Sequence, residues 1–139
     1  MLVLDTNVLS ELLKPHPDEQ VMRWIEHQSP QQLFTTAISR AEILYGIQLL
    51  PKGQRRQKLT DAAKAIFDED FADHVLPFDS LAADRYADIA SKRKAQGKPI
   101  SQFDAIIASI AAAHSARLAT RNVRDFEACG ISIENPWGS

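Results

Sequence analysis

The sequence has little of what several classes of protein require. It contains one cysteine, Cys129, in 139 residues, which excludes an internal disulfide framework and a zinc site built from several cysteines. No apolar run approaches the roughly 18 residues of a membrane span, and no secretory signal pattern follows Met1. With 16 basic and 18 acidic residues, the formal net charge is -2, so the chain as a whole is not a polycationic nucleic-acid binder. These absences predict a reduced, cytoplasmic protein that does not enter a membrane.

The composition that is present is ordinary for a globular domain. Hydrophobic residues make up 45% of the chain and charged residues 24%, which argues against disorder. A chain of this size removes roughly 68% of its unfolded surface from water. Since no repeat, low-complexity stretch or long linker interrupts the sequence, we expect a single domain over residues 1–139.

Short apolar runs alternate with longer amphipathic stretches along the chain. The runs predict strands at residues 1–4, 33–36, 75–78, 117–120 and 131–133. The stretches between them predict helices at residues 7–14, after a cap at Asp18, at 39–50 and 54–71, from a cap at Asp79 or Ser80 to about residue 96 with Gly97 as the C-terminal cap, from Ser101 through 103–114, and at 123–129. This alternation predicts an α/β fold in three layers, α/β/α, with a central parallel sheet of about five strands.

Acidic and amide residues fall where the predicted strands end or the next helix begins. Asp5 ends the first strand, Glu42 lies one turn into the helix after the second strand, and Asp104 lies in the first turn of the apolar helix before the fourth strand. Asn122 and Asp125 follow the fourth strand. Because ligands of open parallel sheets bind beyond the carboxyl ends of the strands, we expect these side chains to meet at one edge.

Carboxylates gathered at one edge indicate a metal site. They repel one another and raise one another's pKa unless a cation lies among them. Mg²⁺ and Mn²⁺ prefer oxygen ligands, and no histidine or cysteine cluster offers an alternative. Beside a phosphodiester, such an ion activates water and stabilises charge on the phosphate oxygens. The pattern therefore suggests metal-assisted phosphodiester hydrolysis.

The same residues also have structural explanations. Glu42 and Asp104 each stand three residues after a serine, Ser39 and Ser101, as in a capping box. Asp5 could close its strand through an Asx-turn. Asp104, however, precedes the apolar residues 105–108, so its carboxylate should be partly buried, and the sequence offers no obvious arginine or lysine to pair with it.

Four motifs carry a family resemblance. In chain order they are residues 4–12 (Leu-Asp-Thr-Asn-Val-Leu-Ser-Glu-Leu), 41–46 (Ala-Glu-Ile-Leu-Tyr-Gly), 103–108 (Phe-Asp-Ala-Ile-Ile-Ala) and 119–126 (Ala-Thr-Arg-Asn-Val-Arg-Asp-Phe). Together they resemble the PIN domain, and in particular the VapC and FitB type of toxin from bacterial type II toxin–antitoxin systems. The resemblance covers essentially the whole chain, including the Asn-Pro-Trp ending at residues 135–137.

The resemblance implies a PIN fold and an endoribonuclease that depends on Mg²⁺ or Mn²⁺. Asp5, Glu42 and Asp104 match the three acidic positions that hold the metal, and Asp125 is the expected fourth catalytic and metal-binding acid. Some family members carry an acid where this chain has Asn122, so we expect that amide to position water or the metal. The expected donors that orient the carboxylates are Thr6, Asn7, Ser39 and Thr120.

The resemblance also implies partners. These are an RNA substrate, structured RNA such as tRNA being one option, a small VapB- or FitA-like antitoxin, a homodimer within a larger toxin–antitoxin assembly, and operator DNA reached through the antitoxin. Beside the expected site, Arg121 and Arg124 are the candidate RNA-binding residues. Two basic runs either bind RNA or form solvated helix faces: Lys52, Arg55, Arg56 and Lys58, and Lys92, Arg93, Lys94 and Lys98.

Two other functions match parts of the sequence. A haloacid-dehalogenase-like phosphatase also begins with an aspartate after an apolar strand, but its chemistry needs a second aspartate two residues later, where this chain has Asn7. A non-catalytic PIN module that acts with its antitoxin as a DNA-bound autoregulatory complex stays open, because Asn122 replaces an acid.

Overall fold

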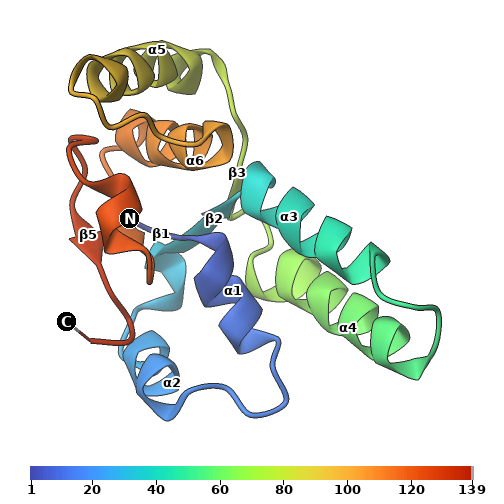
Figure 1. Ribbon diagram of the computed structural model, residues 1–139. Helices are drawn as coiled ribbons and strands as arrows, with labels where there is room; N and C mark the ends of the chain where they lie inside the picture. Colours follow the sequence, from blue (N-terminus) through green and yellow to red (C-terminus); the bar gives the residue numbers. More distant parts are fainter. Residues whose placement is uncertain (139) are drawn as a thin grey trace.

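The computed structural model describes residues 1–138, which form a parallel sheet of five strands (Figure 1). The strands are β1 (Leu2–Leu4), β2 (Leu33–Thr36), β3 (Val75–Leu76), β4 (Arg117–Ala119) and β5 (Ile133–Glu134), in the spatial order β3-β2-β1-β4-β5. From β1 the chain moves outward to β2 and β3, and then returns to β4 on the other side of β1. The strand order therefore reverses between β1 and β4, where open α/β sheets bind their ligands.

Helices cover both faces of the sheet in the described residues. They are α1 (Thr6–Leu12), α2 (Glu19–Glu26), α3 (Ala37–Gln48), α4 (Gln54–Ala65), α5 (Ser80–Ala95) and α6 (Gln102–Ala113). In Figure 1, α5 and α6 lie together on one side of the sheet, and α1, α3 and α4 lie on the other. The predicted three-layer α/β/α architecture is confirmed. No helix in this part of the chain is long and apolar enough to cross a membrane.

The central strand divides its side chains between two hydrophobic cores. Val3 packs with the cluster under α5 and α6, whereas Leu2 and Leu4 pack with the cluster under α1, α3 and α4. All three side chains are fully buried. This alternation follows from the period of two along a strand, and it explains why a continuous apolar run marks a strand covered on both faces.

Most predicted helix ends are confirmed. Asp18, Asp79 and Ser101 cap α2, α5 and α6, each accepting a hydrogen bond from a backbone amide of the first turn. Gly97 has a φ of 74°, and its amide donates to Lys94 O at 3.0 Å. A left-handed residue at this position satisfies free carbonyls at the end of α5, as expected for a glycine C-terminal cap.

Some predicted boundaries are wrong, for local reasons. The helix expected over residues 54–71 ends at Ala65 and continues as a π-helical turn, Ile66–Asp70, closed by a hydrogen bond of 2.8 Å from Phe71 N to Ile66 O. The strand expected over residues 75–78 stops at Leu76, because Pro77 has no amide hydrogen to continue the pairing.

Three further boundaries shift by a few residues. The helix expected from Ser39 begins at Ala37. The helix expected over residues 123–129 is a 3₁₀ turn, Val123–Phe126. The fifth strand, expected over residues 131–133, is Ile133–Glu134, since it is Leu118 and Ala119 of β4 that set its register.

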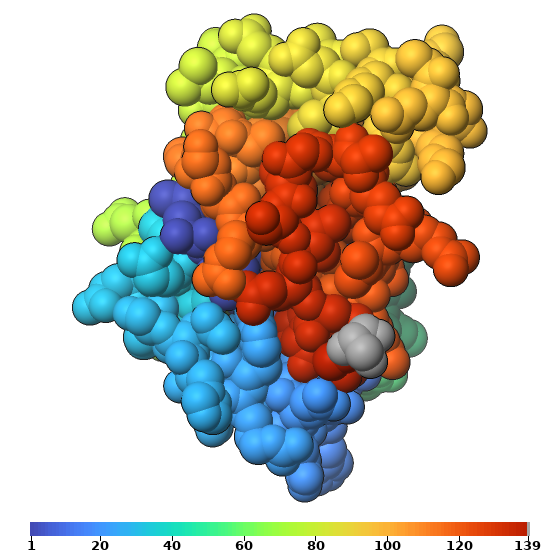
Figure 2. Space-filling model, turned by 90° about the vertical axis from the view of Figure 1, so that its left-hand side faces the viewer, coloured from blue at the N-terminus to red at the C-terminus, as the bar shows by residue number. Residues whose placement is uncertain are grey.

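The C-terminal segment lies across one side of the molecule. Figure 2 shows it in red, between α5 and α6 above and α2 below. Trp137 packs against the core cluster under α1, α3 and α4. Gly138 has a φ of 82°, and a Cβ atom there would fall 2.5 Å from Gln20 Nε2 of α2. The end of the Gln20 side chain could move away from such an atom, so it is the positive φ that favours glycine at this position.

Candidate functional site

Asp5 links the end of β1 to the end of β4 by hydrogen bonds, at the point where the strand order reverses. It follows β1 and caps α1, with Oδ1 accepting a hydrogen bond of 2.8 Å from Thr6 N. Its other oxygen, Oδ2, accepts a hydrogen bond of 2.7 Å from Thr120 Oγ1, directly after β4. Asp5 thus caps α1 through the amide of the next residue and does not form the Asx-turn that was one explanation for it. Its second oxygen faces a residue far along the sequence.

Glu42 is held by α1 and has no capping role. The cap of α3 is Thr36, whose side chain accepts from Ser39 N, so the proposed capping box of Ser39 and Glu42 is wrong. Thr6 Oγ1 donates to Glu42 Oε1 at 2.7 Å and lies 2.9 Å from Ser39 Oγ, whose hydroxyl can donate back to it. Thr6 and Ser39 therefore orient Glu42 toward the end of β1.

Thr120 uses all of its hydrogen-bonding capacity at the site. Its hydroxyl donates to Asp5 and accepts from Asn7 Nδ2 at 3.3 Å and from Asn122 N at 3.0 Å. Asn7 Oδ1 in turn accepts from Arg121 N at 3.4 Å. These bonds tie the first turn of α1 to the segment after β4, and they fix the orientation of the Asp5 carboxylate.

A cleft of about 390 Å³ lies at this edge of the sheet. Seven of the residues lining it are predicted site residues: Asp5, Thr6, Asn7, Glu42, Asp104, Arg121 and Asn122. Ser10 of α1 also lines it. Glu11, Lys14 and Trp137 complete the lining. Ser39 and Thr120 are fully buried behind it. The structure therefore brings the three principal acids to one cleft.

Asp125 and Arg124 do not line this cleft. Both are exposed and line a neighbouring hollow together with Arg93 and Lys98. Asp125 nevertheless acts on the site through its charge, because it raises the pKa of Asp104. Of the two candidates for the fourth position, the amide residue Asn122 is the one inside the cleft.

Burial and the charges of neighbouring acids raise the pKa values of Asp5 and Asp104. Asp5 is 5% exposed, and burial raises its pKa to about 6, against the hydrogen bonds from Thr120 and Thr6 and with a further contribution from the charges of Asp104 and Glu42. Burial also raises the pKa of the half-buried Asp104, while the charge of Arg93 opposes the rise. Arg93 thus acts on Asp104 through its charge, but no ion pair joins the two among the described residues. A cation between the carboxylates would relieve the repulsion.

The donor set fits a hard divalent cation. Asp5, Glu42, Asp104 and Asn122 offer carboxylate and amide oxygens to the same cleft, and oxygen is the ligand atom that Mg²⁺ and Mn²⁺ prefer. Among the described residues, however, no three acidic, histidine or cysteine side chains lie close enough together to hold one ion in the conformations that the structure shows. The fit therefore rests on the chemistry of the donors and on the charges that repel one another.

The sequence pattern did not single out several residues of the cleft. Ser10, Glu11 and Lys14 follow Asn7 at helical spacing, so α1 presents one polar face to the cleft. Burial favours a raised pKa for Glu11, but hydrogen bonds from Asp18 N and Lys14 Nζ, each of 3.0 Å, outweigh it and lower that pKa. The interruption of the apolar face of α1 by these residues is the signal that could have identified them.

Trp137 reaches the cleft from the far end of the chain. The guanidinium of Arg121 lies 5.0 Å from the centre of its ring, within the range of a cation–π contact. This contact holds Arg121 over the rim of the cleft. The Asn-Pro-Trp ending of the sequence was the available signal.

The members of the second basic run differ in their exposure to solvent. Arg93 is buried, with 6% exposure, and donates to the backbone oxygens of Lys98, Asp125 and Glu127. It joins the end of α5 to the segment after β4, so neither alternative for the run applies to it. Lys92, Lys94 and Lys98 are exposed.

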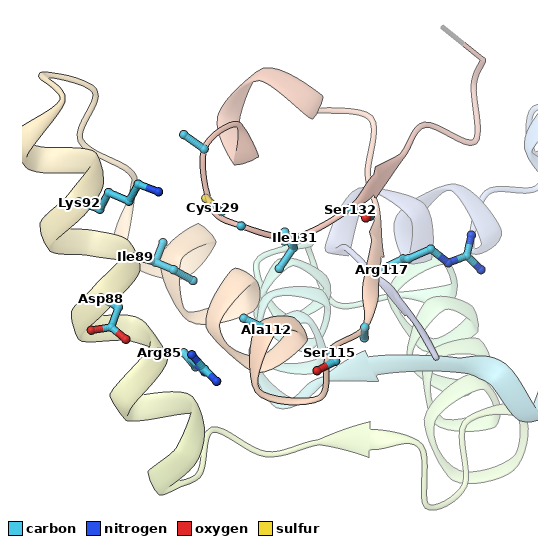
Figure 3. Close-up of a pocket in the computed structure, with 13 residues that line it drawn as sticks. Arg85, Asp88, Ile89, Lys92, Ala112, Ser115, Arg117, Cys129, Ile131 and Ser132 are labelled. Carbon is cyan, nitrogen blue, oxygen red and sulfur yellow. The ribbon is translucent and has the colours of Figure 1, made fainter.

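Another hollow, of about 490 Å³, lies at the opposite edge of the sheet (Figure 3). It is bounded by Arg117 at the start of β4, and by Arg85, Asp88 and Lys92 on one face of α5. Figure 3 shows the Arg117 side chain directed away from these α5 residues. None of the predicted catalytic acids lines this hollow, so its larger size does not make it the catalytic site.

Comparison with known proteins identifies a family and several similar chains. A family model described as "PIN domain" matches residues 2–130. The chain is similar to "VapC ribonuclease Y4jK" of Sinorhizobium fredii, with 42% identity over 137 residues, 99% of this chain and 98% of the relative. It is also similar to "Toxin FitB" of Neisseria gonorrhoeae, with 38% identity over 137 residues, 99% of each chain. A solved structure, "Structure of FitAB bound to IR36 DNA fragment", matches with a TM-score of 0.94 and 37% identity, covering 100% of this chain and 97% of that chain.

Proposed function

Because the chain belongs to the PIN-domain family, we propose that it is the toxin of a type II toxin–antitoxin pair and a metal-dependent endoribonuclease. The observation that carries the proposal is the cleft where Asp5, Glu42 and Asp104 meet beyond the ends of β1 and β4. A relative with 42% identity over nearly its whole length is named a ribonuclease, which supports the reaction class. Structured RNA, such as tRNA, is the substrate class we expect.

The residues of the cleft would hold the metal and orient the substrate. Asp5, Glu42 and Asp104 are the proposed ligands, and Mg²⁺ or Mn²⁺ bound by them would supply activation of water and neutralisation of phosphate charge. Thr6 and Thr120 hold two of these carboxylates in place. Arg121, fixed over Trp137, is placed to bind a phosphate at the rim.

The proposed partners follow from the relatives. The solved structures named FitAB and FitAcB are similar to this chain over 97% or more of its length, which supports a small antitoxin partner and, through it, operator DNA. The exposed apolar residues Tyr45 and Leu49, at 67% and 66% exposure on α3, leave surface for protein contacts. They support a homodimer within a larger assembly, acting in the cytoplasm where its RNA substrate is made.

Loss of Asp5 tests the proposed activity. We expect Asp5→Asn to abolish RNA cleavage while the circular dichroism spectrum stays native, and Asp84→Asn, at an exposed position on α5, to cleave normally. Cleavage by the native chain should stop with EDTA and return with Mn²⁺ or Mg²⁺. Full cleavage by Asp5→Asn would refute the site, and cleavage in EDTA would refute the metal dependence.

A second function is favoured by one feature of the cleft. Asn122, which brings no negative charge, lines the cleft where some family members carry an acid. If this removes activity, the chain acts with its antitoxin as a DNA-bound autoregulatory complex. Operator binding by the complex, with no cleavage of total RNA by the isolated chain at any Mn²⁺ concentration, would identify this function.

A further inference from the structure

A groove extends from the cleft between α1 and α4. It has a volume of about 710 Å³ and is lined by Ser10, Leu13, Lys14, Pro15, Gln54, Arg55, Lys58, Leu59 and Ala62. Ser10 and Lys14 also line the catalytic cleft. This α1–α4 groove and the cleft therefore adjoin each other at the C-terminal half of α1, and we call the two together the depression.

The charge changes sign between the two parts of this depression. The cleft contains the acids Asp5, Glu11, Glu42 and Asp104. The α1–α4 groove contains three cations, Lys14, Arg55 and Lys58, and none of the residues that line it is acidic. An acidic cleft repels an RNA strand, so cations beside it are needed to bring the strand in.

Two of these cations are available for a ligand. Lys14 Nζ lies 3.0 Å from Glu11 Oε1, which uses part of its charge. The ion pairs found among the described residues are those of Lys14, Arg23, Arg40 and Arg117, and they do not include Arg55 or Lys58. Both of the latter side chains are in positions that are exposed to solvent.

The helical spacing places the cations along one wall of the groove. Arg55 and Lys58 stand one turn apart on α4, and Leu59 and Ala62 continue the same face. Leu13 provides apolar surface on the α1 side. The groove thus has a basic wall and an apolar floor, which suit the phosphates and the sugar and base faces of a single strand.

We propose that the α1–α4 groove binds the sugar–phosphate backbone of an RNA strand that leads into the cleft, with Arg55 and Lys58 contacting phosphates. This inference rests on the proposed function and identifies the path of its substrate. It distinguishes the two basic runs of the sequence, because members of the first line a groove that adjoins the cleft, whereas Arg93 of the second is buried.

An acidic protein segment is the competing occupant of the groove. The position of the groove beside the cleft favours RNA, because a strand cleaved at Asp5 must extend to one side of it. Phosphate binding has a characteristic signature, since each cation removed from a phosphate lowers the salt dependence of log affinity for a single strand by about 0.7. Binding can therefore be measured separately from cleavage.

The test compares binding by two variants that lose the same charge. Fluorescence anisotropy in EDTA at low salt measures binding of a labelled 2′-O-methyl RNA of about 20 nucleotides, a length that spans several phosphate contacts. We expect Arg55→Gln/Lys58→Gln to bind about tenfold more weakly and to show a salt slope lower by about 1.4. The control Lys64→Gln/Lys94→Gln changes two exposed residues that do not line the groove and should bind within about twofold of the native chain. Thermal unfolding checks that both variants are folded.

The outcomes separate this inference from the proposed function. Equal RNA binding by the groove variant and the native chain would overturn the inference and leave the proposed function standing. Loss of affinity for polyglutamate without loss of affinity for the RNA would identify an acidic protein segment as the occupant and would also overturn it. Failure of the native chain to bind RNA at low salt would overturn both.

Discussion

Asp5 has a structural role, but its burial has a cost in the stability of the fold. Its two oxygens accept hydrogen bonds from Thr6 N and Thr120 Oγ1, yet its side chain is buried near the charges of Asp104 and Glu42. A buried carboxylate favours the protonated form unless a cation compensates it. The residue therefore destabilises the metal-free fold at neutral pH, as groups at functional sites often do.

The pH dependence of stability should show this cost. The pKa of Asp5 rises from 3.8 in the unfolded chain to about 6 in the fold. The folded state therefore binds the proton more tightly, and the contribution of Asp5 to the unfolding free energy is largest below pH 4 and is lost as pH rises to about 6. The loss amounts to roughly 3 kcal/mol as an upper bound.

Urea unfolding of the metal-free chain between pH 4 and 7 measures this contribution. We expect the unfolding free energy of the native chain, relative to that of Asp5→Asn, to fall across this range. Taking the difference removes the opposite contribution of Glu11, whose pKa is lowered. A difference that does not vary with pH would contradict the raised pKa of Asp5.

Two residues of the segment after β4, Asn122 and Asp125, are candidates for the fourth position of the site. The family resemblance favours Asp125 for its charge, whereas the geometry favours Asn122, which lines the cleft. With the structure in hand, we expect Asn122→Ala to reduce kcat more than Asp125→Asn, by about tenfold against about twofold to threefold, in line with the loss of a group that supports a metal ligand. Steady-state cleavage of the same RNA measures both, and a larger loss in Asp125→Asn would assign the position to the acid.

At the scale of elements, Arg93 joins two segments that are distant in the sequence. It donates to Lys98 O at 2.7 Å and to Asp125 O and Glu127 O at 2.9 Å each. Replacing it leaves three carbonyl oxygens without their charged donor. We expect Arg93→Met to lower the unfolding free energy by about 2–3 kcal/mol, and Lys94→Gln, at an exposed position of the same helix, to change it by less than about 0.5 kcal/mol. Chemical denaturation measures both, and equal stabilities would show that these bonds contribute nothing.

Elements whose signals are local could be predicted from the sequence. The caps at Asp18, Asp79 and Ser101 and the left-handed Gly97 depend on residues within one helical turn, and they occur as expected. The start of α3 could not be predicted, because Thr36 and Ser39 are both good caps and packing decides between them. The π-helical turn after α4 also lacks a local sequence signal.

Part of the candidate site could likewise be predicted from the sequence, and part could not. Asp5, Glu42 and Asp104 could be placed together because parallel strands deliver their carboxyl ends to one edge. The burial of Arg93 and the arrival of Trp137 at the cleft depend on contacts across many residues, which no short pattern encodes. The split between Asn122 and Asp125 depends on the direction of a 3₁₀ turn, where a helix was expected.

At the scale of the whole molecule, positive and negative charges are strongly separated although the net charge is near zero. The net charge is -2, yet acids gather in the cleft, and the adjoining groove holds cations only. A divalent cation that bound the folded cleft and not the unfolded chain would raise the unfolding free energy by about 2.7 kcal/mol at 100 times its dissociation constant.

Thermal unfolding with and without Mn²⁺ checks this expectation. We expect the native chain to gain about 5 °C or more in Tm, and a chain with Asp5→Asn and Asp104→Asn to gain little. The control Asp84→Asn/Asp88→Asn removes two exposed acids of α5 and should respond like the native chain. An equal shift in all three would show that the ion binds elsewhere.

The hydrogen bond between Thr120 and Asp5 joins residues 115 positions apart, and this separation has a consequence for the order of events during synthesis. The ribosome makes β1 well before β4, the strand that completes the cleft. At about 5–20 residues per second, the interval is of the order of ten seconds. A nascent chain therefore carries Asp5 and Glu42 before the cleft around them can form, and the proposed activity can begin only after β4 has been made and has paired with β1.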